Sequence, residues 1–345
     1  MSGAVWLAVA LVLSLPVLTS GWSLLISASF LAEFLSDGAW RPLSVITHAP
    51  SIGPLAASAG IRPVSVDLYE EPGSPGRLPG LVLVHGLSPR GKDDPRLGRA
   101  ASLLARAGWA VAVPTVDGLT VLRLRPDDAL VVVAAVRALE QAGHRPVAIL
   151  GVSLGVGPAL LAAADPGISS CISAVLTLGG YASAVELLRY TLTGAYRFDG
   201  VRGRRPVNES AIAQFARANA ELVDAAGRRL VDNRDPRAVD NLIGELPVET
   251  RQLLTALSPD RVIAGLRAPL FLIHGRDDPA VPFTESLRLA RAARAAGQQP
   301  IVAIVGSLGH VEPEQRASPL DPLRLVMTFY AFRAASMRGC CQVCL

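Results

Sequence analysis

The chain has few charges and almost no lysine. Only 18% of its 345 residues are charged, and Lys92 is the single lysine. Soluble domains typically carry roughly 25% charged residues. The net charge of +4 comes from arginines scattered among acids, so no basic stripe that could follow a phosphate backbone is visible. We therefore expect no nucleic-acid partner.

Cysteine is also scarce. One of the four cysteines is Cys171 in the body of the chain, and the others are Cys340, Cys341 and Cys344 near its end. A disulfide-stapled fold needs a denser set, and a zinc site needs paired cysteines or histidines at ligand spacing. Prenylation needs a cysteine four places from the end, where Gln342 stands instead. We expect no disulfide framework and no metal site, and free thiols at the end of the chain.

The N-terminal region lacks charged side chains, since none occurs in residues 1–32. An apolar run over 4–18 is followed by a second over 22–35, and together they exceed the roughly 7 to 15 residues of a signal-peptide core. About 20 apolar residues suffice to cross a bilayer. We expect residues 1–40 to form a membrane anchor with the rest of the chain on the extracytoplasmic side. The alternative is a signal segment cleaved near residues 26–28, which would release a secreted protein.

From residue 60 onward, short β-branched runs alternate with longer helical patterns. This alternation is typical of an α/β fold, in which helices cover both faces of a mostly parallel sheet. We expect strands at 64–69 (an edge strand), 81–84, 109–113, 147–150, 172–178, 269–273 and 301–305. We expect helices at 95–107, 127–141, 154–164, 285–296 and 320–335.

The alternation stops between residues 181 and 266, where the sequence is polar, helical in pattern and without a convincing strand. This stretch interrupts an alternation that resumes at residue 267. We therefore expect residues 60–180 and 267–338 to form one α/β domain, and residues 181–266 to be a helical insertion.

The sharpest local signal is GVSLG at residues 151–155, a G-x-S-x-G between a β-rich run and a helical one. Small residues two places to either side of Ser153 allow a tight turn that projects the hydroxyl above the sheet. A serine hydroxyl becomes a nucleophile when a base lies within hydrogen-bond reach and a carboxylate orients that base. The pattern predicts nucleophilic catalysis by Ser153.

Five histidines are candidates for the base. The best is His310 in GSLGHVEP, because its loop follows the last expected strand and reaches the sheet edge of Ser153. His85, at the end of LVLVHG, is the second candidate. The sequence GRDDPAVP offers Asp277 and Asp278 as the carboxylate on a loop at the same edge. The residues alone leave both open, although Asp277 better fits a turn residue that caps a backbone N–H.

These segments, in this order, resemble the α/β-hydrolase superfamily over about residues 62–335. LVLVHGL matches its His-Gly element, GVSLG its nucleophile elbow, GRDDPAVP its G-x-x-D-x-x-V-P acid loop and GHVEP its histidine loop. The resemblance implies the α/β-hydrolase fold, a helical cap or lid at 181–266 and a catalytic triad of Ser153, Asp278 and His310. It also implies an oxyanion hole made by the backbone N–H groups of Leu87 and Leu154.

The resemblance further implies a serine hydrolase that cleaves carboxylic esters or thioesters through an acyl-enzyme on Ser153. A small-molecule acyl substrate is expected, with no metal or organic cofactor. The alternatives are a peptidase or acyltransferase of the same fold, and a non-catalytic binding protein.

The chain departs from several groups of the superfamily. It reads HGLSPRG where one lipase and esterase group has HGGG, and its nucleophile is neither the cysteine of dienelactone hydrolases nor the aspartate of haloalkane dehalogenases and epoxide hydrolases. We therefore disfavour those chemistries. Arg90 or Lys92, in the loop 88–96, offers a contact for an acidic substrate group, although such loops are more often simply solvated.

Overall fold

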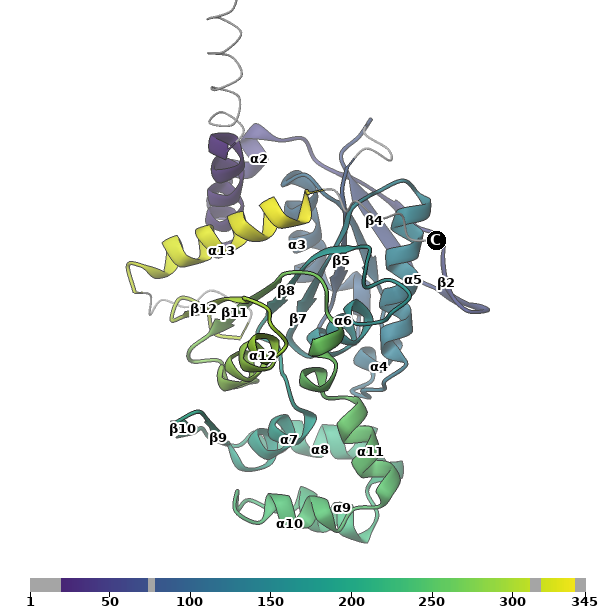
Figure 1. Cartoon of the computed structure of the whole chain (residues 1–345), viewed down its shortest axis with the longest axis vertical. Coiled ribbons are helices and arrows are strands. Elements are labelled where there is room, and N and C mark those ends of the chain that lie inside the picture. The colour runs from purple at the N-terminus through teal and green to yellow at the C-terminus, as the bar shows by residue number, and fades with distance from the viewer. Residues whose placement is uncertain (1–19, 74–77, 311–317, 339–345) are drawn as a thin grey trace, which may run out of the picture.

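The computed structural model describes residues 20–73, 78–310 and 318–338. Its centre is an eight-stranded sheet in the order β1-β4-β6-β5-β7-β8-β11-β12 (Figure 1). The strands are β1 (Ser51–Pro54), β4 (Val66–Glu70), β5 (Gly80–Val84), β6 (Ala110–Pro114), β7 (Val147–Val152), β8 (Ile172–Leu178), β11 (Leu270–Gly275) and β12 (Ile301–Val305). The pairs β1–β4 and β4–β6 are antiparallel and the others are parallel. The mostly parallel sheet expected from the sequence is confirmed.

Helices cover both faces of this sheet. One face carries α5 (Asp128–Gln141), α6 (Val156–Ala163) and α12 (Thr284–Ala295), and the other carries α3 (Pro95–Arg106) and α13 (Asp321–Ser336). Side chains alternate along a strand, so in β5 Val82 packs with the first set while Leu81 and Leu83 pack with the second. A strand buried on both faces is apolar throughout, which explains the uninterrupted run LVLV.

The expectation of an edge strand at 64–69 is wrong. Strand β4 occupies most of this stretch, but β1 pairs along its outer side, with Ile52 opposite Tyr69. The sequence of β1, SIGP, contains a glycine and a proline, which are depleted in strands and tolerated mainly at an edge. The sequence of β1 therefore does not predict a strand. A short hairpin of β2 (Ala57–Ala59) and β3 (Arg62–Val64) separates β1 from β4.

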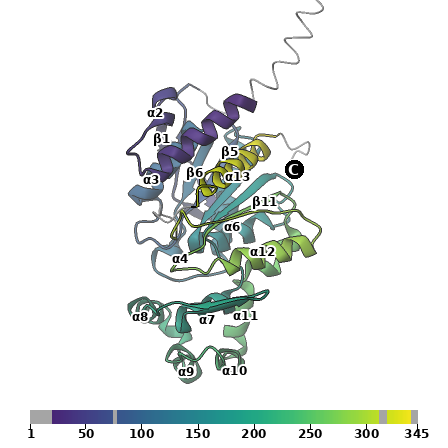
Figure 2. The same cartoon turned by 90° about the vertical axis from the view of Figure 1, so that its left-hand side faces the viewer.

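The expected membrane anchor is contradicted. Residues 20–35 are helical, but no helix within the described ranges combines the length and the apolar character needed to span a membrane. The helix instead lies beside α13 (Figure 2), where Phe30 stacks on Phe329 at 4.2 Å between ring centroids. The Arg333 guanidinium also donates a hydrogen bond to Ser23 Oγ at 2.7 Å. Part of the second apolar run, including Ile26, Phe30 and Leu31, is therefore buried against protein, and the run 4–18 lies outside the described residues.

Between β8 and β11 the chain builds a separate group of helices, at the lower end of Figure 1. We call residues 184–256 the helical layer. It contains α7 (Ala184–Thr193), α8 (Glu209–Ala218), α9 (Ala225–Val231), α10 (Val239–Gly244) and α11 (Val248–Ala256). The layer has a small apolar core of its own, made of Leu192, Ile212, Ala226, Leu230, Val239 and Leu246.

Two features within the described residues were not expected. The layer contains a hairpin of β9 (Ala195–Phe198) and β10 (Val201–Arg204), so the expectation of no strand there is wrong. Its turn is Asp199-Gly200, with φ of 50° and 81°, and Asp-Gly is a strong sequence signal for a two-residue hairpin turn. In addition, Cys171, buried just before β8, is disulfide-bonded.

Candidate active site

Ser153 occupies a tight turn between β7 and α6. Its φ is +53°, a left-handed conformation that is uncommon for residues with a Cβ and is often found at functional sites. The flanking glycines permit this turn. A Cβ at Gly155 would collide with the carbonyl oxygen of His85, and one at Gly151 would lie 2.9 Å from the Cα of Val156. The glycine spacing in GVSLG therefore has a direct steric cause.

The structure brings Ser153, His310 and Asp278 together in one hydrogen-bonded chain. His310 Nε2 lies 2.5 Å from Ser153 Oγ, and His310 Nδ1 lies 2.6 Å from Asp278 Oδ2. The other carboxylate oxygen of Asp278 accepts the backbone N–H groups of Ala280 and Val281 at 2.7 and 2.9 Å. The carboxylate is thus held by its own loop and orients the imidazole toward the hydroxyl.

A second histidine contacts the same carboxylate. His274 is fully buried at the end of β11, and its Nε2 lies 3.3 Å from Asp278 Oδ2 and 3.0 Å from the carbonyl oxygen of Val281. Because both neighbours are acceptors, Nε2 carries a proton, and Nδ1 lies 2.7 Å from the hydroxyl of Ser286. His274 is therefore held by hydrogen bonds on both ring nitrogens.

The two histidines decide the charge of Asp278. Burial raises the pKa of this carboxyl, but the hydrogen bonds from His274 and His310 outweigh burial and leave the pKa below its usual value. Asp278 is consequently ionised at neutral pH.

His85, the second candidate for the base, has a different role. Its Nδ1 lies 2.7 Å from the carbonyl oxygen of Gly86, and its Nε2 accepts the backbone N–H of Val116 at 2.9 Å. Burial lowers the pKa of His85, and these partners together require the neutral ring protonated at Nδ1. His85 ties the end of β5 to the loop after β6 and does not contact Ser153.

Asp277 also points elsewhere. Its carboxylate accepts a hydrogen bond from Arg205 at 3.0 Å, in the segment between β10 and α8. Of the two carboxylates that the residues alone leave open, only Asp278 therefore faces His310. Lys92 Nζ is bound to Asp67 at 2.9 Å and to Asp93 at 2.7 Å, so its charge is already compensated.

A cavity of 1260 Å³ opens beside Ser153 and His310. Leu87 and Leu154, whose backbone N–H groups are the expected oxyanion donors, lie in its wall. Gly86 lets the loop of Leu87 lie against the elbow, because a Cβ there would be 2.9 Å from Ser153 Cβ. Neither Arg90 nor Lys92 belongs to the described part of the lining.

Comparison with known proteins gives similarity of fold alone. No family model and no curated protein matches the chain. Among solved structures, an acylaminoacyl peptidase from Pyrococcus horikoshii superposes with a TM-score of 0.59 and 15% identity over 85% of this chain. A dienelactone hydrolase from Anabaena variabilis superposes with a TM-score of 0.50 and 17% identity over 84% of this chain and 100% of its own. The chain has the α/β-hydrolase fold.

Another α/β-hydrolase structure, a puromycin-hydrolysing peptidase from Mycobacterium tuberculosis, superposes with a TM-score of 0.53 and 21% identity over 84% of this chain. The similarity covers only 43% of the Pyrococcus peptidase chain and 39% of the Mycobacterium chain. This protein thus spans less than half the length of either peptidase, whereas it matches the whole dienelactone hydrolase.

Two residues near the site were not identified from the sequence. His274 ends a strand in LFLIHG, four residues before Asp278, and that spacing at a strand end was its available signal. Tyr190, on α7, donates its hydroxyl to the carbonyl oxygen of Pro279 at 3.0 Å, and no local pattern pointed to it. Burial raises the pKa of Tyr190 to about 12, so at neutral pH it acts only as a hydroxyl donor.

Proposed function

We propose that the protein is a serine hydrolase that cleaves carboxylic esters or thioesters through an acyl-enzyme on Ser153. The observation that supports this most is the hydrogen-bonded chain from Ser153 Oγ through His310 to Asp278. A hydroxyl, an imidazole and an ionised carboxylate in this order are the components of a nucleophilic triad.

In the proposed mechanism, Ser153 Oγ attacks the carbonyl carbon of the substrate while His310 Nε2 takes the hydroxyl proton. The protonated imidazole then gives this proton to the departing alcohol or thiol as the bond to the carbonyl carbon breaks. A water molecule next attacks the acyl-enzyme, with His310 again accepting and returning a proton, and the acid leaves. Asp278 holds the proton on Nδ1 and stabilises the imidazolium that forms twice in each cycle.

The negative charge that develops on the substrate oxygen also needs donors. We assign them to the backbone N–H groups of Leu87 and Leu154, because both residues line the cavity beside Ser153. Donors of this kind are fixed before the reaction starts, and the loss of one typically costs roughly 100-fold or more in rate. No cofactor enters the proposed reaction.

We further propose that the insertion 181–266 acts as a cap over the site. In support, residues of α7, α8 and α11 line the same cavity as Ser153 and His310, and the Tyr190 hydroxyl connects α7 to the loop of Asp278. A cap in this position shapes the substrate pocket and limits access of water. The layer would therefore decide which acyl compounds reach Ser153.

Peptide cleavage is the second candidate, because peptidases are among the solved structures of the same fold. An acyl-enzyme mechanism serves amides and esters alike, so the fold leaves this choice open. The leucine-rich lining beside Ser153 favours an apolar ester over a peptide, whose backbone needs polar partners. Transfer of the acyl group to an acceptor other than water is a variant of the same chemistry.

A fluorophosphonate probe tests the proposal, because it labels only an activated serine. We expect labelling of the wild-type protein, no labelling of Ser153→Ala, and unchanged labelling of the matched variant Ser58→Ala on exposed β2. Persistent labelling of Ser153→Ala would contradict the proposal. Failure to label a folded wild-type protein would favour a non-catalytic binding protein.

Substrate class is tested separately with p-nitrophenyl esters and with peptide p-nitroanilides. We expect turnover of the esters and at least a hundredfold lower kcat/KM for the amides. The reverse order would identify a peptidase.

A further inference from the structure

Two apolar groups of residues from different parts of the fold line the cavity, and we call the space beside each group an arm. The layer arm is bordered by residues of the helical layer, and the N-terminal arm by residues of the helix 20–35, α3 and α13. The layer arm is lined by Leu187, Leu188, Phe215, Leu222, Leu253 and Leu254. The N-terminal arm is lined by Phe30, Phe34, Leu97, Leu103, Leu325 and Phe329.

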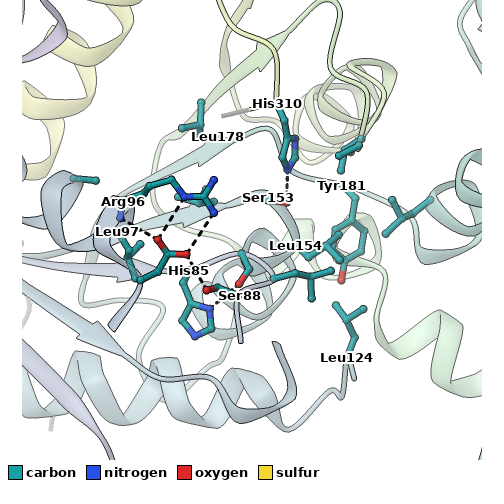
Figure 3. Close-up of a pocket in the computed structure, with 18 of the residues that line it drawn as sticks. His85, Ser88, Arg96, Leu97, Leu124, Ser153, Leu154, Leu178, Tyr181 and His310 are labelled. Atoms are coloured by element: carbon teal, nitrogen blue, oxygen red, sulfur yellow. Dashed lines mark hydrogen bonds and ion pairs between the residues drawn. The ribbon is translucent and has the colours of Figure 1, made fainter. Parts of the chain in front are cut away.

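The nucleophile stands between the arms. Figure 3 shows Ser153 and His310 in the centre, with Leu97 to one side and Leu154, Tyr181 and Leu124 to the other. A carbonyl carbon attacked by Ser153 carries an acyl chain and a leaving group, and these must extend in different directions. The two arms provide one apolar space for each.

Several charged groups in the wall already have hydrogen-bond or ion-pair partners within the protein. Glu33 accepts the backbone N–H of Ser44 at 2.9 Å, and Asp94 accepts the hydroxyl of Ser88 at 2.8 Å. Arg125 binds Glu221 at 2.7 Å. A charged ligand would have to break such pairs or lose its own hydration without a replacement, whereas a neutral ligand leaves them intact.

The volume points to a large ligand. Ordinary ligand cavities measure about 300 to 1,000 Å³, and this one reaches 1260 Å³. An acetyl or butyryl ester would leave most of that apolar wall facing water.

We propose, on the basis of the proposed hydrolase function, that the substrate is a neutral ester with a long aliphatic chain on each side of the scissile bond. One chain fills the layer arm and the other fills the N-terminal arm. The apolar contacts of the two chains thereby bring the ester carbonyl to Ser153 and to the proposed oxyanion donors. Discrimination against short or charged esters follows from the wall and not from the triad.

Two substrate series on the full chain test this inference. In p-nitrophenyl esters the acyl chain grows from two to twelve carbons, and in alkyl acetates the alcohol grows over the same range. We expect kcat/KM to rise in both series, by up to about fourfold per added methylene, the equivalent of ~0.8 kcal/mol. A flat or falling profile in either series would overturn the two-armed site.

A matched pair of variants on α8 locates one chain. Ala216 lines the layer arm, whereas Ala213 on the same helix is exposed and outside the lining. We expect Ala216→Trp to lower kcat/KM for the longest esters at least tenfold in one of the two series and not in the other. Ala213→Trp should behave as wild type in both. Equal effects of the two variants, or no effect of Ala216→Trp on either series, would overturn the assignment of a chain to this arm.

Two controls keep this test separate from the proposed function. Should Ala216→Trp not fold by circular dichroism, Gln214→Trp at an exposed position of the same lining replaces it with the same expected outcome. If the wild type neither hydrolyses p-nitrophenyl acetate nor reacts with the fluorophosphonate, the hydrolase function itself fails. If both reactions depend on Ser153 while chain length has no effect, only the inference about the substrate fails.

Discussion

The sheet edge and the helical layer are built in different ways. At the sheet edge, Asp278 and His274 are essentially excluded from solvent and are held by backbone groups and by each other. The layer has only a small core, and polar contacts such as Tyr190 to Pro279 and Arg125 to Glu221 connect it to the sheet domain.

This difference matches two separate requirements of the proposed function. A triad needs positions accurate to a fraction of an ångström, which buried strands and satisfied hydrogen bonds supply. A pocket for long chains needs apolar surface and room to open, and regions with few buried contacts open most easily. In the proposed function, the sheet edge therefore performs the chemistry and the helical layer selects the substrate.

The largest effect on kcat is expected when a carboxylate at the sheet edge, Asp278, is compared with one in the helical layer, Asp240. Asp278→Asn removes the charge that orients and stabilises His310, and we expect kcat to fall about 10⁴-fold on a short ester. Asp240→Asn, in the layer, removes a largely exposed partner of Arg189 and should change kcat less than threefold. Steady-state kinetics on both variants tests the contrast, and similar losses in the two would refute it.

We also expect Asp278→Asn to change how the free energy of unfolding depends on pH. The pKa of Asp278 is lowered in the folded state, so its charge stabilises the fold above the unfolded pKa of about 3.9. That stabilisation is lost as the pH falls through the folded pKa. Below pH 4 the wild type should therefore lose stability more steeply than Asp278→Asn, as measured by urea unfolding.

Replacing a glycine by alanine should also have opposite effects on stability in the two regions. Gly155→Ala places a Cβ against the carbonyl oxygen of His85, whereas Gly244→Ala on α10 meets no atom within 4 Å. We expect the first to lower the free energy of unfolding by about 3 kcal/mol and to abolish fluorophosphonate labelling. The second should raise it by about 0.5 kcal/mol, because alanine favours helix. Urea unfolding measures both, and equal changes would show that the elbow tolerates a side chain.

A third pair compares the two cores. Leu230→Ala in the layer core should speed proteolysis within residues 184–256 and cost about 2 to 3 kcal/mol of local stability. Leu139→Ala, on α5 in the core of the sheet domain, should lower the melting temperature of the whole protein without selective cleavage of the layer. Limited proteolysis with mass spectrometry distinguishes the two patterns. Unselective cleavage of Leu230→Ala would mean that the layer and the sheet unfold as one unit.

The smallest effect lies at the junction of the two regions. Asp128 begins α5 and accepts the backbone N–H of Arg125, whose side chain binds Glu221 of the layer. Burial raises the pKa of Asp128 to about 6. Its protonated form thus stabilises the fold below about pH 4, and this stabilisation is lost as the pH rises through 6. Relative to Asp128→Asn, the wild type should lose about 2 kcal/mol between pH 4 and pH 7; parallel pH profiles would contradict the prediction.

Much of the sheet domain was predictable because its signals are local. Strands β5, β7 and β8 are buried on both faces, so their apolar runs stand out in the sequence, and Gly108 marks the end of α3. The hairpin at Asp199-Gly200 has an equally local turn signal, but it lies in a polar sequence whose pattern is otherwise helical. Strand β1 was not visible, because pairing with β4 outweighs the poor strand propensity of SIGP.

By itself, the sequence determined that Ser153 stands on a tight turn between a strand and a helix, because the glycine spacing that permits the turn spans only five residues. Residue types alone left Asp277 and Asp278 open and the family resemblance favoured Asp278, but only the tertiary structure shows that Asp278 faces His310. Tertiary structure likewise decided that an apolar segment near the N-terminus packs against α13. These outcomes depend on atoms that are far apart in the chain, such as the rings of Phe30 and Phe329. An apolar sequence indicates that a segment will be buried, but only the folded chain shows which surface it packs against.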